Sequence, residues 1–537
     1  MHMQEHVLVL EPSGLRIVIN EQTTILEAIR MVGLQIPSEC GGRGTCGKCR
    51  VILNPTNPPT QVEIQRLGEH DIEAGLRLAC QHRIRSDTRA VIPHTSTAAK
   101  ILTSGVSSAN DFAPDEGHEG EFGIAVDLGT TTIVAYLLDL DNGNQIANLA
   151  DLNPQVIFGE DVMSRITYAM KDEKSRTLLK ERVLEKIDAL STILCNESGV
   201  PLNKLLRLVV VGNTAMHHLA LGLDSSSLGL APYEPQMRDA FTSNGRSIGF
   251  KSVPKAEVYF APNVAGFVGG DTLAFILSQR LDLVDDIVLG IDIGTNGEIV
   301  LSKRGELFCC SAAAGSAFEG ATISHGMRGQ DGAIEHLAIR EIDDAPEISV
   351  IGGGSPMGVC GSAIVDTVAE LLRNGLIDAG GRMKASARVV DDAKAGLAYL
   401  VVDIGEHASK NRIMFTQRDV RQVQLAKGAI LAGTQILMQV ANVRTEDIKA
   451  IYLAGAFGNY IDPPSALRIG LFPPVDLERI VPVGNAAGEG AKRLLVSRKS
   501  RELIEQLRRE INYYELATHD DFAGIFAQAT ILESARD

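Results

Sequence analysis

Four cysteines in the N-terminal region have the spacing of an iron–sulfur site. Cys40, Cys46 and Cys49 lie within ten positions of a glycine-rich loop, and Cys80 follows farther along the chain. Plant-type [2Fe–2S] sites place three thiolates in one loop and a fourth at a distance, with one residue fewer between the first two. Structural zinc sites, the alternative, usually pair two compact knuckles. The spacing therefore favours a [2Fe–2S] cluster with two thiolates on each iron.

Two turns of similar composition lie in the middle of the chain, at residues 126–132 (VDLGTTT) and 291–298 (IDIGTNGE). In each, a buried strand ends at an aspartate, Asp127 or Asp292, and a glycine permits a tight turn. The N–H groups and hydroxyls of such a turn can cradle phosphate, while the aspartate positions Mg²⁺ or a water. Two copies predict two similar lobes that face each other across a nucleotide cleft. The alternative is a duplicated fold that no longer binds nucleotide.

A third glycine turn, at residues 453–459 (LAGAFGN), follows a buried strand and suits a base and ribose. With a connecting helix expected at residues 358–366 (GVCGSAIVD), this order resembles the ASKHA superfamily of acetate kinase, sugar kinases, heat-shock chaperones and actin. The resemblance implies two phosphate loops and an adenosine loop for MgATP. The candidate nucleotide-binding residues are Asp127, Gly129, Thr130 and Thr131 in the first loop, Asp292, Gly294, Thr295 and Asn296 in the second, and Gly455 and Gly458 in the third.

Another glycine-rich stretch carries Glu319, whose carboxylate could position a water at a phosphate. A partner-facing loop and a plain loop carboxylate are the alternatives. Asp127, Asp292 and Glu319 are the predicted catalytic residues. His217 and His218 are adjacent at a predicted helix start, where neighbouring side chains point in different directions, so capping or core packing is favoured over a shared metal. The cysteines without ligand spacing are predicted core residues: Cys195, Cys309, Cys310 and Cys360.

The predicted helices and strands that position these residues follow a different pattern in the N-terminal region than in the rest of the chain. Residues 1–95 read as a hairpin around a Pro-Ser-Gly turn, a helix, the cysteine loop and two further strands. This order and the cysteine loop resemble the β-grasp [2Fe–2S] ferredoxin fold. After a linker at residues 96–120, three strands, a long helical region from about residue 159 to 198 and a strand–helix unit form a first ASKHA-like lobe, residues 121–284. A second lobe, residues 285–537, repeats the opening, so the fold class is α/β multidomain.

The length, net charge and apolar content of the chain exclude several classes of function. The chain has 537 residues, too many for one core, and a formal net charge of −16. This acidic balance argues against nucleic acid, which binds basic surfaces. The start does not read as a signal peptide, and no apolar stretch predicts a membrane span. We therefore expect a cytoplasmic protein, in which clustered cysteines more often mean metal or redox chemistry than disulfides.

The order of motifs is similar to one family over essentially the whole chain. A [2Fe–2S] region, a short linker, and then VDLGTTT, NPQVIFGEDVMSRI, GNTAMHH, PNVAGFVGGD, DIGTNGE and LAGAFGN resemble the reductive activators of corrinoid proteins. The resemblance implies an ATP-dependent enzyme that passes one electron to the cobalt of a corrinoid methyltransferase-system protein, taking Co(II) to Co(I). Cys40, Cys46, Cys49 and Cys80 would carry the electron, and the Asp-Gly-Thr loops would bind MgATP.

Three other functions stay open at this point. One is an ATP-driven electron donor to another low-potential enzyme, such as a radical dehydratase, although those activators usually carry a [4Fe–4S] cluster between subunits. Another is a redox-sensing module that binds nucleotide without catalysis. A simple kinase is hard to reconcile with the iron–sulfur region. An upstream electron donor is implied, and the oligomeric state, with a homodimer among the options, is left open.

Overall fold

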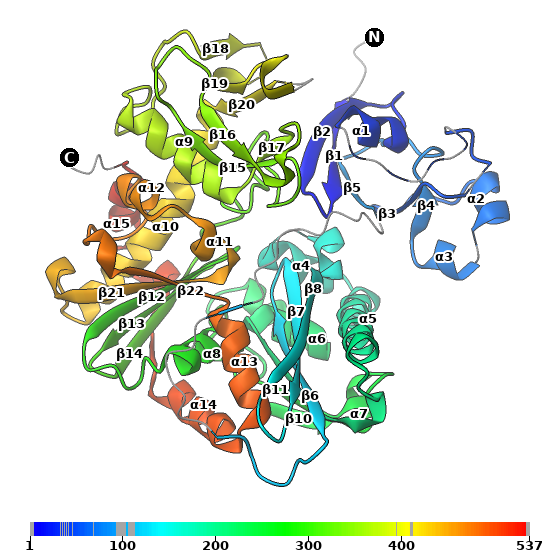
Figure 1. The fold of residues 1–537 in the computed structure, drawn as a ribbon, viewed down its shortest axis with the longest axis vertical. Helices are drawn as coiled ribbons and strands as arrows, with labels where there is room; N and C mark the ends of the chain where they lie inside the picture. The colour runs from blue at the N-terminus through cyan, green and yellow to red at the C-terminus, as the bar shows by residue number, and fades with distance from the viewer. Residues whose placement is uncertain are drawn as a thin grey trace. The chain divides into compact units, whose positions relative to one another are not determined.

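The computed structural model describes residues 5–532, apart from positions 33, 35, 37, 39, 41, 46, 68, 93–103, 106–112, 160, 394 and 409–411 (Figure 1). Contacts divide the chain into two units. Unit 1 comprises Met1–Lys100 and Ala317–Val423, and unit 2 comprises Ile101–Ser316 and Gln424–Asp537. By contacts, residues 317–423 thus group with the N-terminal region, whereas the sequence placed them in the second lobe. Most of the predicted linker lies outside the described residues, and the domain boundaries stay predictions.

The N-terminal part of unit 1 is a five-stranded mixed sheet with the strand order β2-β1-β5-β3-β4. Strands β1 and β2 form the predicted antiparallel hairpin. Helix α1 begins at a capping box, in which Thr24 and Glu27 bond each other's backbone N–H groups, and Ile25, Leu26 and Ile29 pack into the core of the sheet. The bounds are β1 Glu5–Glu11, β2 Leu15–Asn20, α1 Ile25–Met31, β3 Arg50–Asn54, α2 Gln61–Arg66, α3 Glu69–Glu73, β4 Leu76–Leu78 and β5 Thr88–Val91.

The rest of unit 1 holds two small sheets and helix α9. One sheet has the order β16-β15-β17, and the other is an antiparallel meander, β18-β19-β20. Helix α9 confirms the connecting helix predicted near residues 358–366 and begins at Gly361. Met327 and Cys360 share a buried core with the N-terminal sheet, and Arg328 pairs with the buried Glu11. The bounds are β15 Ala333–Ala338, β16 Glu347–Val350, β17 Gly358–Val359, α9 Gly361–Arg373, β18 Val389–Asp392, β19 Gly396–Val402 and β20 Ile413–Thr416.

Unit 2 contains the predicted duplication as two six-stranded sheets. The first sheet has the order β10-β11-β9-β6-β7-β8 and the second β22-β21-β12-β13-β14-β23. In each, the opening strand (β6 or β12) pairs antiparallel with the next strand and parallel with a later one (β9 or β21). The bounds are β6 Phe122–Leu128, β7 Thr132–Asp139, β8 Gln145–Leu152, β9 Leu205–Gly212, β10 Phe241–Asn244, β11 Glu257–Phe260, β12 Ile287–Ile293, β13 Gly297–Lys303, β14 Glu306–Ala312, β21 Ile448–Ala454, β22 Ile480–Gly484 and β23 Asn512–Tyr513.

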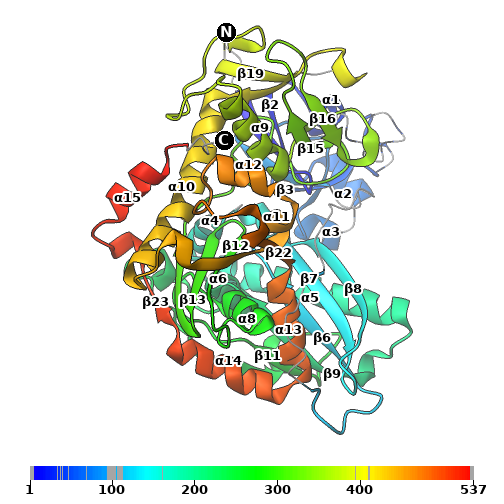
Figure 2. The same ribbon diagram turned by 60° about the vertical axis from the view of Figure 1, so that its left-hand side comes forward.

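The helices of unit 2 connect and cover these sheets. The predicted helical region after residue 159 is two helices, because Asp172 caps a second helix start shortly after the first helix ends at Ala169. Helices α8 and α13 lie side by side (Figure 2), and a Cβ at Gly490 would lie 2.1 Å from the Ala274 carbonyl oxygen. Within the described parts of the chain, no helix has the length and apolar character to cross a membrane. The bounds are α4 Val162–Ala169, α5 Glu173–Ser198, α6 Thr214–Leu221, α7 Gly245–Ile248, α8 Gly270–Gln279, α10 Gln417–Val440, α11 Gly455–Tyr460, α12 Pro463–Arg468, α13 Ala486–Val496, α14 Arg498–Glu510 and α15 Phe522–Ala529.

Residues that the sequence assigned to the core are buried. His217 and His218 both lie inside α6, and His218 Nδ1 is 2.7 Å from the Thr214 carbonyl oxygen. Burial lowers the pKa of both imidazoles, so both are neutral packing residues near neutral pH. The cysteines without ligand spacing are also buried, as predicted: Cys195, Cys309, Cys310 and Cys360.

Candidate functional site

Three of the four predicted cluster ligands lie among the described residues, and all three are buried. The exposed fractions are 8% for Cys40, 1% for Cys49 and 9% for Cys80, whereas Cys46 lies outside the described residues. Strand pairing brings two of them together, because β3 pairs antiparallel with β4 and the Ala79 N–H donates to the Cys49 carbonyl oxygen at 2.8 Å. The small sheet thus brings together the segments that carry Cys49 and Cys80, which are far apart in the sequence.

The glycines of the thiol loop take backbone conformations that other residues rarely adopt. Gly42, Gly44 and Gly47 have φ values of +100°, +77° and +68°. A Cβ at Gly42 would lie 4.0 Å from the Cys80 Cβ, which places the loop backbone beside the distant cysteine. Gln81 Nε2 also donates to Cys80 Sγ at 3.4 Å. Buried thiols inside a close glycine backbone fit an iron–sulfur cluster, whose sulfurs accept hydrogen bonds from the protein.

A buried hydrogen-bonded contact between Glu63 and His82 supports the segment that carries Cys80. Glu63 Oε1 lies 2.8 Å from His82 Nε2, and the same oxygen accepts a hydrogen bond from the Leu78 N–H at 2.6 Å. Burial opposes ionisation of Glu63, but hydrogen bonds from His82, Thr60 and Leu78 outweigh it and lower the pKa of this carboxyl to about 2. Sequence analysis did not single out this pair, which fixes residues 78–82 from both sides of the cysteine.

The first predicted phosphate loop is a tight turn at the end of β6. A Cβ at Gly129 would lie 2.7 Å from the Thr132 carbonyl oxygen, so the turn requires glycine. Residues that follow neighbouring strands hydrogen-bond to the loop. Asn153 donates to the Gly129 carbonyl oxygen from Nδ2 and to the Thr131 carbonyl oxygen from its backbone N–H, both at 2.8 Å. Asn213 Nδ2 donates to Thr130 Oγ1 at 3.0 Å.

The second predicted phosphate loop and the predicted adenosine loop meet at one carboxylate. Gly294 N–H donates to the Asn296 carbonyl oxygen at 2.9 Å, which closes the turn after β12, and Thr295 is buried. Gly455 has φ +83°, and a Cβ there would lie 2.5 Å from Asp292 Oδ1. Only glycine therefore lets the turn between β21 and α11 lie against Asp292. Gly458 lies one turn later in α11 and packs against Leu453.

Four carboxyl groups gather near these loops without a compensating cation among the described residues. Burial raises the pKa of Asp127 to about 6, although a hydrogen bond from Asn485 lowers it. Burial, together with the like charges of Asp271 and Asp127, raises the pKa of Asp292 to about 7. Burial and the like charge of Asp127 raise the pKa of Asp271 to about 7, and burial with the like charges of Asp271 and Asp292 raises the pKa of Glu298 on β13. A site that confines several carboxylates favours a bound cation.

The donor set fits a hard cation that keeps part of its water. Carboxylate and hydroxyl oxygens are ligands that Mg²⁺ accepts, and Mg²⁺ in nucleotide sites usually has one or two carboxylates plus waters and phosphate oxygens. Consistently, in the described part of the chain no three His, Cys, Asp or Glu side chains are grouped closely enough to hold a metal alone.

Two residues that sequence analysis did not select complete this site. Asp271 lies in the first turn of α8, where burial and the charge of Asp127 raise its pKa, and its own charge helps to raise the pKa of Asp292. Asn485 caps α13 and donates from Nδ2 to Asp127 Oδ2 at 2.9 Å. A signal existed, because a Gly-Asn pair follows a buried strand twice, at Asn213 and at Asn485, and each caps the next helix.

Glu319, the third predicted catalytic residue, lies in unit 1, whereas Asp127 and Asp292 lie in unit 2. Its role beside the carboxylates stays a prediction. A turn closed by the Gly320 N–H and the Ala317 carbonyl oxygen carries it.

Comparison with known proteins gives matches along most of the chain. Residues 8–85 match the 2Fe–2S iron–sulfur cluster binding domain, residues 122–283 the RACo middle region and residues 286–537 the C-terminal domain of RACo, the ASKHA domain. The corrinoid activation enzyme RamQ of Eubacterium limosum is 37% identical over 431 residues, which are 78% of this chain and 72% of the relative.

Two further relatives have related names. The [Co(II) methylated amine-specific corrinoid protein] reductase of Methanosarcina barkeri is 25% identical over 75% of this chain and 76% of its own. The solved structure of a reductive activator for corrinoid, iron–sulfur protein covers 99% of each chain with a TM-score of 0.71 and 29% identity. These matches confirm the predicted [2Fe–2S] ferredoxin-type domain followed by an ASKHA body. The chain belongs to the family of corrinoid activation enzymes.

Proposed function

We propose that the protein uses MgATP to reduce the cobalt of a corrinoid protein of a methyltransferase system from Co(II) to Co(I). One electron is transferred from an upstream low-potential donor to the cobalt, which is the substrate. One observation carries the proposal. A chain of this family combines a buried thiol site with a duplicated body, and that body has four carboxyl groups near two Gly-Thr turns.

In this proposal the thiol region supplies the electron carrier and the duplicated body supplies the nucleotide site. Cys40, Cys46, Cys49 and Cys80 would hold a [2Fe–2S] cluster, which supplies one-electron redox chemistry when bound. For one electron, each ~59 mV of potential is a factor of ten in equilibrium, so an acceptor well below the donor is rarely reduced. Nucleotide can shift that equilibrium only if two states of the protein bind it with different affinities.

The residues of unit 2 have separate tasks in this proposal. The N–H groups and hydroxyls of the two loops, with Thr130 and Thr295, would bind phosphate oxygens. Asp127 and Asp292 would orient Mg²⁺ and its waters, and Gly455 and Gly458 would leave room for the adenosine. Because Mg²⁺ binds the ionised carboxylates whose pKa values burial raises, its binding would release protons.

The direct test follows the absorbance of a Co(II) corrinoid protein under anaerobic conditions, with reconstituted enzyme and a low-potential chemical reductant. The wild type should form Co(I) with MgATP and little without it. Cys49→Ser should abolish cobalt reduction but keep nucleotide binding, whereas the matched variant Cys195→Ser, which changes a buried cysteine outside the thiol loop, should retain both.

Other results would change the assignment. Equal reduction with and without MgATP, or full reduction by Cys49→Ser, contradicts the proposed electron route. ATP hydrolysis without reduction of any corrinoid protein would favour the redox-sensing module, and reduction of a radical dehydratase instead would favour the other electron-donor function.

A further inference from the structure

The chain enters unit 2 beside the candidate nucleotide site. Unit 1 ends its first segment at Lys100, and unit 2 begins at Ile101. Of the next residues, Ser104 and Gly105 are described and lie against the start of α13: Gly105 forms an antiparallel bridge with Gly484. The Asn485 N–H donates to the Ser104 carbonyl oxygen at 3.0 Å, and the Gly105 N–H donates to Glu489 Oε1 at 3.2 Å.

The backbones of Gly105 and Gly484 lie so close together that neither position has room for a side chain. A Cβ at Gly484, which has φ +70°, would lie 2.4 Å from the Ser104 carbonyl oxygen. A Cβ at Gly105 would lie 2.6 Å from the Asn485 carbonyl oxygen and 2.6 Å from Glu489 Cγ. Real Cβ atoms do not approach other atoms this closely, so the contact depends on glycine on both sides. The linker strand, which we define as Ser104–Gly105, is therefore fitted to the β22–α13 turn.

The side chain of the same asparagine faces the other way, into the carboxylate site. Asn485 Oδ1 accepts a hydrogen bond from the Gly488 N–H at 2.8 Å, which caps α13. That cap fixes the orientation of the amide, so Nδ2 donates to Asp127 Oδ2 at 2.9 Å and to the Tyr136 hydroxyl at 3.1 Å. One residue thus contacts the linker through its backbone and Asp127, on the other sheet, through its side chain.

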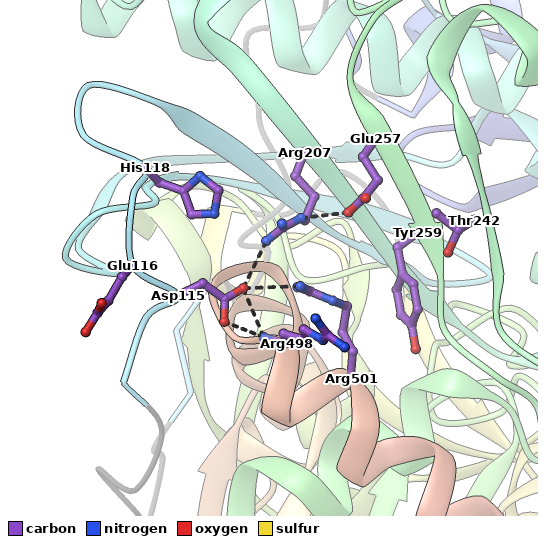
Figure 3. A pocket seen from close by; sticks show the side chains of 9 residues that line it. All are labelled: Asp115, Glu116, His118, Arg207, Thr242, Glu257, Tyr259, Arg498 and Arg501. Atoms are coloured by element: carbon purple, nitrogen blue, oxygen red, sulfur yellow. Dashed lines mark hydrogen bonds and ion pairs between the residues drawn. The ribbon is translucent and has the colours of Figure 1, made fainter.

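A second anchor fixes the chain after the linker strand. Asp115 accepts hydrogen bonds from the Arg498 N–H at 2.8 and 3.1 Å and from Arg501 Nη2 at 3.2 Å, and Arg207 Nη1 lies 3.6 Å away. Figure 3 shows its carboxylate between these three arginines. All four residues line a cavity of about 620 Å³. The Asp115 N–H also donates to the Val496 carbonyl oxygen at 2.9 Å. The two anchors lie at the start and end of α13.

We propose that Asn485 is the positioning residue for Asp127 and that the linker strand holds Asn485 in place, so that these two linker residues influence the nucleotide site. This inference rests on the proposed function, because Asp127 matters only if the site binds MgATP. Asn485 does not touch the nucleotide in this scheme; it sets the orientation of a carboxylate that does.

The test measures MgATP hydrolysis and MgATP binding by full-length protein with three substitutions. Asn485→Ser keeps a good helix cap but removes the donor to Asp127, so kcat should fall about 10- to 100-fold, the range for a hydrogen bond to a charged group, with Kd and melting temperature nearly unchanged. Asn485→Asp keeps the cap oxygen and sets a second carboxylate against Asp127, so the loss should be larger. Gly105→Ala, which displaces the linker strand without φ strain, should lower kcat about 3- to 10-fold.

Matched controls separate positioning from stability. Asn244→Asp changes an exposed helix cap of the same kind, and Gly524→Ala adds a Cβ where no atom lies within 4 Å; both should hydrolyse MgATP like the wild type. If the wild type binds and hydrolyses MgATP but Asn485→Ser and Gly105→Ala retain its kcat, this inference is wrong and the proposed function stands. If the wild type binds no MgATP, the proposed function fails and this inference fails with it.

Discussion

The two sheets of unit 2 share the order of five strands, β11-β9-β6-β7-β8 and β22-β21-β12-β13-β14, yet they surround their aspartates differently. Asp127 ends β6 in the first sheet and Asp292 stands at the same place on β12 in the second. Asp127 accepts a hydrogen bond from Asn485, and burial raises its pKa to about 6. Asp292 faces the like charges of Asp271 and Asp127 besides its burial, and its pKa rises to about 7.

This difference shows that the two duplicated sheets keep the position of the aspartate but not its surroundings. The strand pairing places both carboxyls at the same edge of their sheets, because it is set by backbone hydrogen bonds and buried apolar faces. The helices that follow the sheets then decide the surroundings: α13 brings a donor to Asp127, whereas α8 brings a carboxylate towards Asp292. We expect Asp292 to be the carboxyl that most needs a cation.

The largest effect should come from Asp292→Asn. The amide cannot offer a charge to Mg²⁺, and the loss of a group that stabilises transition-state charge commonly costs about 10²–10³-fold in rate. MgATP hydrolysis should fall by that factor, while the visible absorbance of the reconstituted cluster should stay the same. Folding should survive because the side chain it replaces has a pKa raised to about 7 and is often neutral.

Asp285→Asn is the matched control for this prediction, since Asp285 is exposed on the loop before β12. It should hydrolyse MgATP at the wild-type rate. Full activity in Asp292→Asn would remove Asp292 from the site and break the comparison between the sheets.

The stability of the nucleotide-free protein should fall as pH rises, and MgATP should weaken this dependence. Burial raises the folded-state pKa of Asp127 to about 6 and of Asp292 to about 7, above their ordinary value near 4. Their contribution is therefore fully present below pH 4 and is lost as pH rises towards 7, by about 2–4 kcal/mol for each carboxyl. Nucleotide-free protein in EDTA should melt at lower temperature at pH 7.5 than at pH 5.5.

Mg²⁺ with ATP should restore more stability at pH 7.5 than at pH 5.5, because it binds the ionised carboxylates. Scanning calorimetry over this range checks both statements. A stabilisation by MgATP that is independent of pH would show that these carboxyls are not the ones that meet the cation.

Contiguous motifs made much of this site predictable from sequence. Asp127, Gly129 and Thr130 are consecutive or nearly so, and a strand that ends in such a turn places them together whatever the rest of the chain does. A local turn signal and apolar residues at helical spacing likewise predicted the hairpin and helix of the N-terminal sheet, where the structure adds a capping box of Thr24 and Glu27. Local hydrogen bonds and strand periodicity suffice for such elements.

Residues that meet only through packing were not predictable in this way. Asp271 and Asn485 reach the site because α8 and α13 pack closely, as the approach of Gly490 to Ala274 requires. The Gly-Asn pair marks Asn485 as a helix cap, but no local pattern encodes its contact with Asp127. The grouping of residues 317–423 with the N-terminal region likewise depends on a shared buried core, to which Met327 and Cys360 contribute.

The glycines of the two sheets should also differ in what they tolerate. Gly455→Ala adds a Cβ 2.5 Å from Asp292 Oδ1 at a φ of +83°, so both the turn and the carboxyl must move. We expect about tenfold weaker MgATP binding, measured by calorimetric titration. Gly129→Ala meets only the Thr132 carbonyl oxygen, at 2.7 Å and without a positive φ, and should cost less. Equal losses would show that Asp292 is not the sensitive carboxyl.

The smallest effect expected is a gain of stability from Asp271→Asn. Asp271 contributes a like charge that helps to raise the pKa of Asp292, so its neutralisation should bring that pKa down. The nucleotide-free protein should gain about 1 kcal/mol of unfolding free energy at pH 7.5, measured by urea denaturation. The gain should vanish near pH 5, where the carboxyls are protonated in either case. A loss of stability at pH 7.5 would mean that Asp271 has a structural partner whose loss outweighs the relief of repulsion, and that the second sheet does not confine excess charge.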